Sequence, residues 1–331
     1  MHPIIIINSV AGSINSVKCW VFFIPSLKQI KKTTKRSKKQ LRMSPKPIFR
    51  EYIIGSKEVP PIEGFPVEII NRRIPEFHFI LAFAAEDYVE DGSGKKVGKG
   101  NFSANWNVTK FSAKKIRELK EDYEHVKVVI SLGGRGTNFP FNPQDKEIWI
   151  DNAKKSLNQI ITVLYKFHHE TVIDGIDINY EHIESSEDEF AYCIGKVIDY
   201  LKSNISGVVV SIAPSFPVLS HYQQLFKANP HRIQWVNYQY YDQKVPSTHE
   251  FVNLHKTLID TFGVEKLLAG FSTDPNDKGN ISAEVFVEGV LQLLASGSLA
   301  GIFVSDAQSS LLSEPPLYLE KKSQEILTGT N

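Results

Sequence analysis

Residues 174–181 read Asp-Gly-Ile-Asp-Ile-Asn-Tyr-Glu, an apolar run that carries carboxyl and amide groups at alternate positions. Side chains alternate across a β-strand, so Asp177, Asn179 and Glu181 point to one face and the residues between them point to the other. Polar groups on one face of an apolar strand are costly to bury unless that face lines a polar site. The stretch therefore predicts a buried strand that ends at a functional site.

A rhythm of apolar strand, loop and amphipathic helix runs through the chain from Ile48 onward. Near-continuous apolar runs favour parallel strands that are covered on both faces. Eight such strands alternating with helices predict a closed (β/α)8 barrel, a TIM barrel. The alternative is an open doubly wound sheet, but no Gly-x-Gly-x-x-Gly follows a strand to support it. The expected strands span 48–54, 77–85, 126–132, 175–180, 208–213, 235–240, 267–271 and 301–304, and the expected helices span 113–123, 145–167, 187–203, 221–228, 248–262, 283–295 and 317–327.

The start of the chain differs from the rest in charge. Residues 1–47 hold ten Lys and Arg and no acidic residue, which leaves 28 basic and 37 acidic residues in the remainder, a net charge of −9. So acidic a body argues against binding to nucleic acid, because a phosphate backbone needs a basic face. We interpret residues 1–45 as a basic low-complexity extension, disordered or absent from the mature protein, and residues 46–328 as one barrel domain.

Several other classes of protein are disfavoured. The apolar runs near the start are shorter than the roughly 20 residues of a membrane span, and the basic cluster follows them, unlike in a signal peptide. Two cysteines, Cys19 and Cys193, cannot form a disulfide framework. No spacing indicates a metal site, and we expect no cofactor. We expect a cytoplasmic monomer, or a secreted or vacuolar protein if the N-terminal segment is a targeting signal.

The stretch 174–181 resembles the Asp-Gly-x-Asp-x-Asp-x-Glu signature of family-18 glycoside hydrolases, the chitinase family, with Asn179 in place of an Asp. Three further stretches, PKPIFREYI at 45–53, VVISLGGRG at 128–136 and GFSTDP at 270–275, are similar to those of narbonins. Narbonins are plant seed proteins with a family-18 barrel and no established catalytic role. The resemblance covers about residues 45 to 325 and implies a cytosolic protein that serves as a nitrogen store.

The resemblance also implies roles for individual residues. In family 18 the acetamido oxygen of the substrate attacks the anomeric carbon, so the protein supplies a general acid and an anion that faces the oxazolinium cation. Glu181 matches the acid, Asn179 stands where the anion is expected, and Asp177 would lie deeper and share a proton with its neighbour. Tyr241 matches the tyrosine that holds the acetamido oxygen. Further substrate contacts are expected from Asp174, Gly133, Gly134, Gln239 and Asp242.

Three departures from the family pattern predict weak catalysis. Asn179 is isosteric with Asp but neutral, and losing a preorganised charge costs on the order of 3 kcal/mol, about a hundredfold in rate. Ser305 stands where the family has a tryptophan that packs against the sugar. Arg135 is expected to pair with Glu181 or Asp177, to lower the carboxyl pKa, and so to leave Glu181 in the wrong state for a proton donor.

Three functions remain open. The first is a catalytically silent barrel with a storage or structural role. The second is a lectin-like protein that binds N-acetylglucosamine oligosaccharides. The third is a slow hydrolase of β-1,4-linked N-acetylglucosamine that works by substrate-assisted retaining catalysis. The three departures favour a protein with little or no hydrolase activity.

Overall fold

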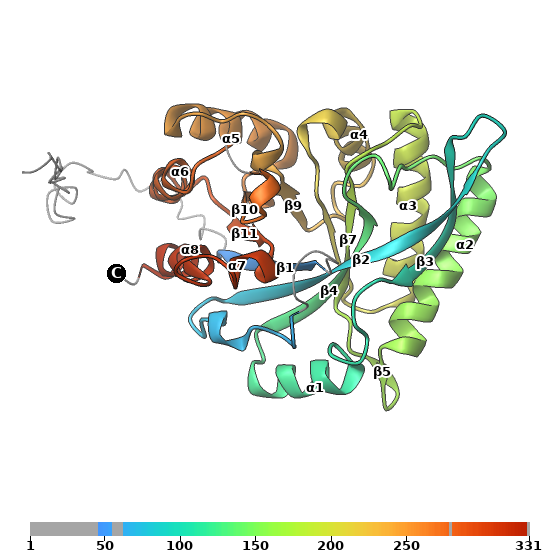
Figure 1. The fold of residues 1–331 in the computed structure, drawn as a ribbon, viewed down its shortest axis with the longest axis horizontal. Helices are drawn as coiled ribbons and strands as arrows, with labels where there is room; N and C mark the ends of the chain where they lie inside the picture. Colours follow the sequence, from blue (N-terminus) through green and yellow to red (C-terminus); the bar gives the residue numbers. More distant parts are fainter. Residues whose placement is uncertain (1–45, 55–61, 278–279, 330–331) are drawn as a thin grey trace, which may run out of the picture. The chain divides into compact units, whose positions relative to one another are not determined.

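The structure, a computed structural model, describes residues 46–54, 62–277 and 280–329. Eight parallel strands follow one another around a ring, and the last pairs with the first, so the predicted (β/α)8 barrel is confirmed (Figure 1). The expected extension at residues 1–45 lies outside the described residues. In ring order the strands are β1 (Ile48–Ile54), β2 (Glu76–Glu90), β4 (Val126–Gly134), β7 (Gly175–Tyr180), β8 (Val209–Ile212), β9 (Trp235–Tyr238), β10 (Leu267–Ser272) and β11 (Gly301–Ser305).

Helices connect the strands and cover the outside of the barrel (Figure 1). Four helices begin at a serine cap: the hydroxyls of Ser112, Ser186, Ser247 and Ser282 each accept the backbone N–H three residues ahead. Ser220, which precedes an apolar helical pattern in the same way, lies inside its helix and donates to Glu187 instead. The helices are α1 (Ala113–Asp122), α2 (Lys146–Asn158), α3 (Glu187–Asn204), α4 (Leu219–Ala228), α5 (Thr248–Phe262), α6 (Ala283–Ser296), α7 (Ala307–Ser310) and α8 (Tyr318–Thr328).

The helix expected over 145–167 is shorter in the structure. α2 ends at Asn158 and a π-helical segment, Gln159–Leu164, follows it. The chain then forms a small hairpin of β5 (Lys166–Phe167) and β6 (Glu170–Thr171). The π-helical segment ends in two exposed apolar side chains, Val163 and Leu164. The apolar pattern at these positions therefore does not correspond to buried residues.

The segment expected as a long loop over 86–105 is mostly a hairpin. β2 continues beyond its pairing with β4, and β3 (Lys96–Ala104) pairs with it antiparallel and packs against α2 (Figure 1). The buried carboxylate of Glu86 accepts the N–H of Gly100 (2.7 Å) within the hairpin. It also accepts the indole N–H of Trp149 in α2 (2.6 Å) and the hydroxyl of Tyr180 in β7 (2.7 Å), and these two bonds hold the hairpin to the rest of the barrel. Residues 86–105 are therefore held in place as a hairpin that packs against α2.

β1 illustrates how each strand divides its side chains. Phe49 packs against Phe77 on the helix side, whereas Arg50 and Tyr52 point into the barrel, where they contact residues of β7 and β9. The barrel interior is consequently polar at its centre. No helix in the ranges that the structure describes is long and apolar enough to cross a membrane, and Cys193 is a buried free thiol.

Candidate active site

Asp177 lies at the centre of the barrel and is fully buried. Its two carboxylate oxygens accept four hydrogen bonds, from Tyr52 (2.8 Å), Ser131 (2.8 Å), Ser211 (2.6 Å) and Asn237 (3.1 Å). Four bonds fill the acceptor positions of a carboxylate. Asp177 forms no hydrogen bond to Asn179 among the described contacts, so the expected sharing of a proton with that neighbour has no contact to support it.

Arg50 provides the positive charge nearest to this buried carboxylate. It is fully buried and donates from Nη1 to the side-chain oxygen of Asn237 at 2.8 Å. Asn237 in turn donates to Tyr52 and to Asp177, at 2.8 and 3.1 Å. Burial lowers the pKa of Arg50, and the charge of Asp177 opposes that change. The charge of Asp177 therefore stabilises the charged form of Arg50, and the amide of Asn237 bridges the two side chains.

Gln239 fixes the orientation of Asn179. The Gln239 nitrogen donates to the backbone carbonyl of Ala213 and to Oδ1 of Asn179, both at 3.0 Å. A backbone carbonyl can only accept a hydrogen bond, so the end of the Gln239 amide that contacts Ala213 must be the nitrogen. This nitrogen is a donor, so the atom of Asn179 that it contacts must be the oxygen. The free end of the Asn179 side chain therefore carries N–H groups, and it carries no negative charge.

Glu181 follows the end of β7 and is only partly exposed. Its Oε2 accepts the backbone N–H of Gly136 at 3.1 Å. Burial raises the pKa of Glu181 to about 7, and the charge of Arg135 only partly opposes this rise. Near neutral pH a large fraction of Glu181 is therefore protonated, which is the state that a general acid requires. The expectation of an ionised Glu181 was wrong, because desolvation outweighs the attraction of Arg135.

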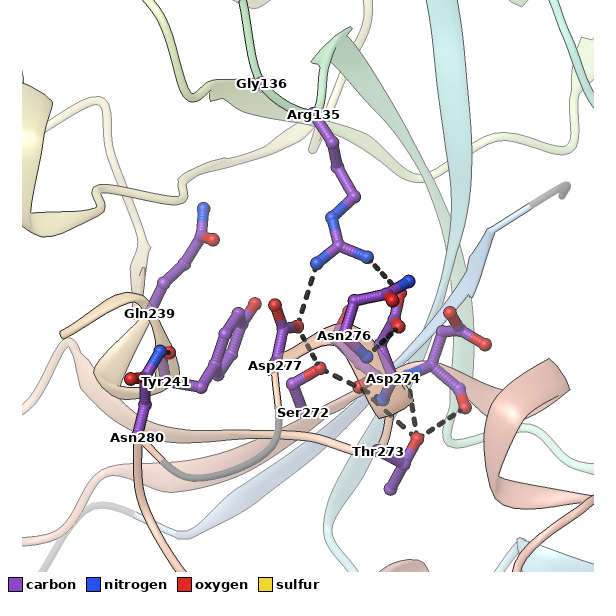
Figure 2. Close-up of polar contacts among 12 residues, drawn as sticks. Arg135, Gly136, Gln239, Tyr241, Ser272, Thr273, Asp274, Asn276, Asp277 and Asn280 are labelled. Carbon is purple, nitrogen blue, oxygen red and sulfur yellow. Dashed lines mark hydrogen bonds and ion pairs between the residues drawn. The ribbon is translucent and has the colours of Figure 1, made fainter. Parts of the chain in front are cut away.

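Arg135 does not form the expected ion pair with Glu181 or Asp177. Its Nη1 donates to Asp274 at 2.5 Å and its Nη2 donates to Asp277 at 2.8 Å (Figure 2). Arg135 directly follows β4, and both aspartates follow β10, which lies four strands away around the ring of eight. We call this contact the Arg135 bridge. It spans the mouth of the barrel between opposite strands.

The hydroxyl of Ser272 supports the Arg135 bridge by donating to Asp277 at 2.5 Å and accepting the backbone N–H of Asp274 at 3.2 Å. The GFSTDP stretch at 270–275 had signalled family resemblance, but nothing in the sequence linked it to Arg135. Figure 2 shows Tyr241 beside the Arg135 bridge, and the charges of Arg135 and Asp277 act on it. The bridge therefore lies among the residues that the family resemblance assigns to substrate.

The segment after β9 brings three of the expected site residues together. Gln239 is buried, and a short 3-10 turn, Tyr240–Asp242, follows it. Tyr241 is buried, and its pKa is raised by burial and by the neighbouring charge of Glu181. Burial also raises the pKa of Asp242. Tyr240 packs instead against Phe251 of α5, as expected for a residue between barrel and helices.

Asp174 lies outside this group of residues. It precedes the N-terminal end of β7, whereas Glu181 follows the other end, a strand length of roughly 20 Å away. Its carboxylate accepts the backbone N–H of Val128 at 2.7 Å and pairs with Lys120 at 2.6 Å. The expected substrate contact is therefore corrected to a structural role at the opposite end of the barrel.

Gly133 has a structural reason to be glycine. Its φ is +111°, and a Cβ placed on it would lie 2.5 Å from the backbone oxygen of Asn179. A Cβ on Gly134 would lie 2.6 Å from the ring of Phe139. Both glycines let the end of β4 pack closely on its surroundings. Contact of these glycines with a sugar stays a prediction.

Replacing Arg135 by Met is expected to raise the pKa of Glu181 above its value of about 7, because the positive charge that opposes the rise is removed. Carbon-13 NMR of the glutamate carboxyl groups would follow this titration. Arg117→Met, on the exposed surface of α1, is the matched control and should leave it unchanged. An unchanged or lowered Glu181 pKa in the Arg135 variant would contradict the electrostatic picture given above.

Known proteins share this architecture. Residues 77–275 match the family described as glycosyl hydrolases family 18. Chitinase 1 of Tulipa saxatilis subsp. bakeri is 36% identical over 291 residues, which are 86% of this chain and 88% of the tulip protein. The chain belongs to glycoside hydrolase family 18. The family resemblance of its motifs is thereby confirmed.

Other relatives of this family-18 chain differ in their descriptions. The RuBisCO-associated protein of Glycine max is 27% identical over 280 residues, 80% of this chain and 92% of the soybean protein. Among solved structures, the catalytic domain of a chitinase from the fern Peteris ryukyuensis is 32% identical, with a TM-score of 0.68. The family 18 chitinase of Crocus vernus is 29% identical, with a TM-score of 0.72. Each of these two structural matches covers 85% of this chain and 99% of the chitinase chain.

Proposed function

We propose that this chain is a narbonin-like family-18 protein with little or no hydrolase activity, which serves as a storage or structural protein or binds sugars. The orientation of Asn179 carries this proposal. Its oxygen already accepts a hydrogen bond from Gln239, and its free end offers N–H groups where the family reaction needs an anion. A neutral donor cannot stabilise a developing oxazolinium cation, so the reaction loses its main electrostatic support.

The Arg135 bridge supports the same proposal. It joins opposite strands across the barrel mouth, beside Tyr241 and close to the charge of Glu181. A sugar ring that reached the family's substrate position would have to pass or displace an ion pair to two aspartates. Human YKL-39, described as a pseudo-chitinase with retained chitooligosaccharide binding, shares the fold at 14% identity and a TM-score of 0.60. The fold alone therefore does not imply hydrolysis.

A slow chitinase is the second candidate function, and the state of Glu181 favours it. The pKa of about 7 keeps this carboxyl available as a proton donor near neutral pH. The tulip relative that shares 36% of its residues is itself named a chitinase. Such an enzyme would cleave β-1,4-linked N-acetylglucosamine slowly, with Glu181 as the acid and Asn179 as the limiting residue.

Product analysis of N-acetylglucosamine tetramers and hexamers would test the proposal, with Glu181→Gln as the control and an active family-18 chitinase assayed in parallel. We expect the wild-type rate to lie at least about a hundredfold below that of the active enzyme. Slow turnover that Glu181→Gln abolishes would identify the second candidate. A wild-type rate equal to that of the active chitinase, lost in Glu181→Gln, would overturn the proposal. Calorimetry with the tetramer would separate sugar binding from a storage role.

A further inference from the structure

Two fully buried glutamates lie behind the barrel wall on elements that pack against each other, and the charge of Glu320 acts on Glu51. Glu51 lies in β1 on the helix side, and Glu320 lies in the first turn of α8. All four of their carboxylate oxygens are buried. Among the described residues, no donor meets the distance and angle of a normal hydrogen bond to any of them. The neighbours of Glu51 in strand register are Phe79 and Val304, which are apolar and buried. The local environment therefore gives this pair no polar compensation from the sheet.

The charged groups around the pair make ionisation more costly. Asp306, which caps α7, is a third carboxylate close enough to act on both glutamates. Lys321 on α8 is exposed, and its positive charge lowers the pKa of Glu320 only weakly. Ser310 of α7 is the polar group that most favours ionised Glu320, and no cation acts on Glu51. Two buried negative charges without a counter-ion are strongly destabilising.

We propose that Glu51 and Glu320 form a protonated carboxyl pair that holds α8 against β1, and that loss of these protons to the solvent loosens the C-terminal helix. Protonation removes the charges and gives each carboxyl group an O–H that can donate to a neighbouring oxygen. The C-terminal helix packs on β1, which pairs with the last strand, so the two glutamates lie where the ring of strands is closed. This inference does not depend on the proposed function.

A bound metal ion would be the other way to neutralise the pair. Calcium takes six to eight oxygen ligands, and magnesium takes six in near-octahedral geometry. Here two carboxylates are accompanied by Ser323, whose buried hydroxyl has no partner among the described contacts. No group of three or more His, Cys, Asp or Glu in the described ranges is arranged to hold a metal. The donor set therefore favours protons over a cation.

The direction of the pH effect follows from the pKa shifts. Burial and mutual repulsion raise the pKa of Glu51 well above its ordinary value of 4.5 and also raise that of Glu320. The folded state then holds more protons than the unfolded state at pH values above 4.5. The stabilising contribution is complete below that pH and is lost as pH rises toward the raised folded pKa. The opening equilibrium of α8 should increase up to about tenfold per pH unit for each proton released.

Hydrogen exchange of residues 318–329, measured by mass spectrometry between pH 5.5 and 8.5 and corrected for intrinsic rates, would test this. In the wild type we expect protection of α8 to fall with rising pH, while the barrel strands keep theirs. In Glu320→Gln the fall should be smaller, and in Glu51→Gln with Glu320→Gln protection should stay constant. Glu325→Gln, an exposed change on the same helix, should behave like the wild type.

Three results would overturn the proposal. The first is constant α8 protection in the wild type across this pH range. The second is a loss of α8 protection in the double variant as large as in the wild type, which would show that other groups cause the effect. The third is recovery of protection at pH 8.5 on adding calcium, magnesium or sodium chloride, reversed by chelation or dilution, which would show that a cation holds the pair. If the double variant fails to fold, Glu320→Gln alone carries the comparison.

Discussion

Replacing Asn179 by Asp is expected to raise the rate of hydrolysis of N-acetylglucosamine oligomers about a hundredfold, which corresponds to about 3 kcal/mol of transition-state stabilisation. An Asp in this position would keep the hydrogen bond from Gln239, because that bond already ends on an oxygen. It would replace N–H groups by a second carboxylate oxygen and restore the negative charge. Glu181 needs no change, because its pKa of about 7 already suits a proton donor.

Release of oligomer products by wild type and variant would be compared under identical conditions. The double variant Asn179→Asp with Glu181→Gln is the control, since the gain must depend on the acid. A gain that persists without Glu181 would point to a contaminating enzyme. If Asn179→Asp has no effect, the missing charge is not the limiting defect, and the Arg135 bridge or the missing aromatic platform at Ser305 would limit the reaction instead.

Replacing Asp177 by Ala is expected to lower the free energy of unfolding by about 4 kcal/mol or more, a large part of the stability of a typical domain. The change leaves four buried donors without an acceptor and removes the negative charge that faces Arg50. Each unsatisfied buried donor costs about 1 to 3 kcal/mol, reduced where hydroxyls can turn to other acceptors. Urea denaturation followed by circular dichroism would measure the loss.

Ser211→Ala is the matched control for this prediction. It removes one of the four donors to Asp177 and leaves the charge in place, so a loss of only about 1 kcal/mol is expected. A loss for Asp177→Ala no larger than that of Ser211→Ala would mean that the buried network contributes little. Asn179 on the same strand makes no contact with Asp177 among the described hydrogen bonds, so its variants report on catalysis rather than on this network.

The sequence was sufficient for the barrel because its signals are local. Apolar runs such as 126–132 and 175–180 identify strands by themselves, and Ser112, Ser186, Ser247 and Ser282 mark helix starts through bonds only three residues long. β3 was missed because Gly98 and Gly100 within it are typical of loops. Its strand conformation depends on pairing with the extended end of β2 and on packing against α2.

The sequence predicted that most of the candidate site residues lie near one another, with Asp174 as the exception, but it did not predict their electrostatics. Motifs placed Asp177, Asn179, Glu181 and Tyr241 together, because strand ends meet at one rim of a barrel. The partner of Arg135 could not be read from the chain, since Asp274 and Asp277 are about 140 residues away in sequence. The pKa of Glu181 depends on how much solvent the surrounding loops exclude, and no local pattern encodes that quantity.

The bonds to Asp177 also bear on how this barrel assembles. The carboxylate comes from β7, and its donors come from β1, β4, β8 and β9, so both halves of the ring contribute. A fragment that ended after the fourth strand, β7, would keep the donors Tyr52 and Ser131 but would leave the buried charge without the donors on β8 and β9. Independent half-barrels are therefore disfavoured in this chain, and its folding should be cooperative across the whole ring rather than modular.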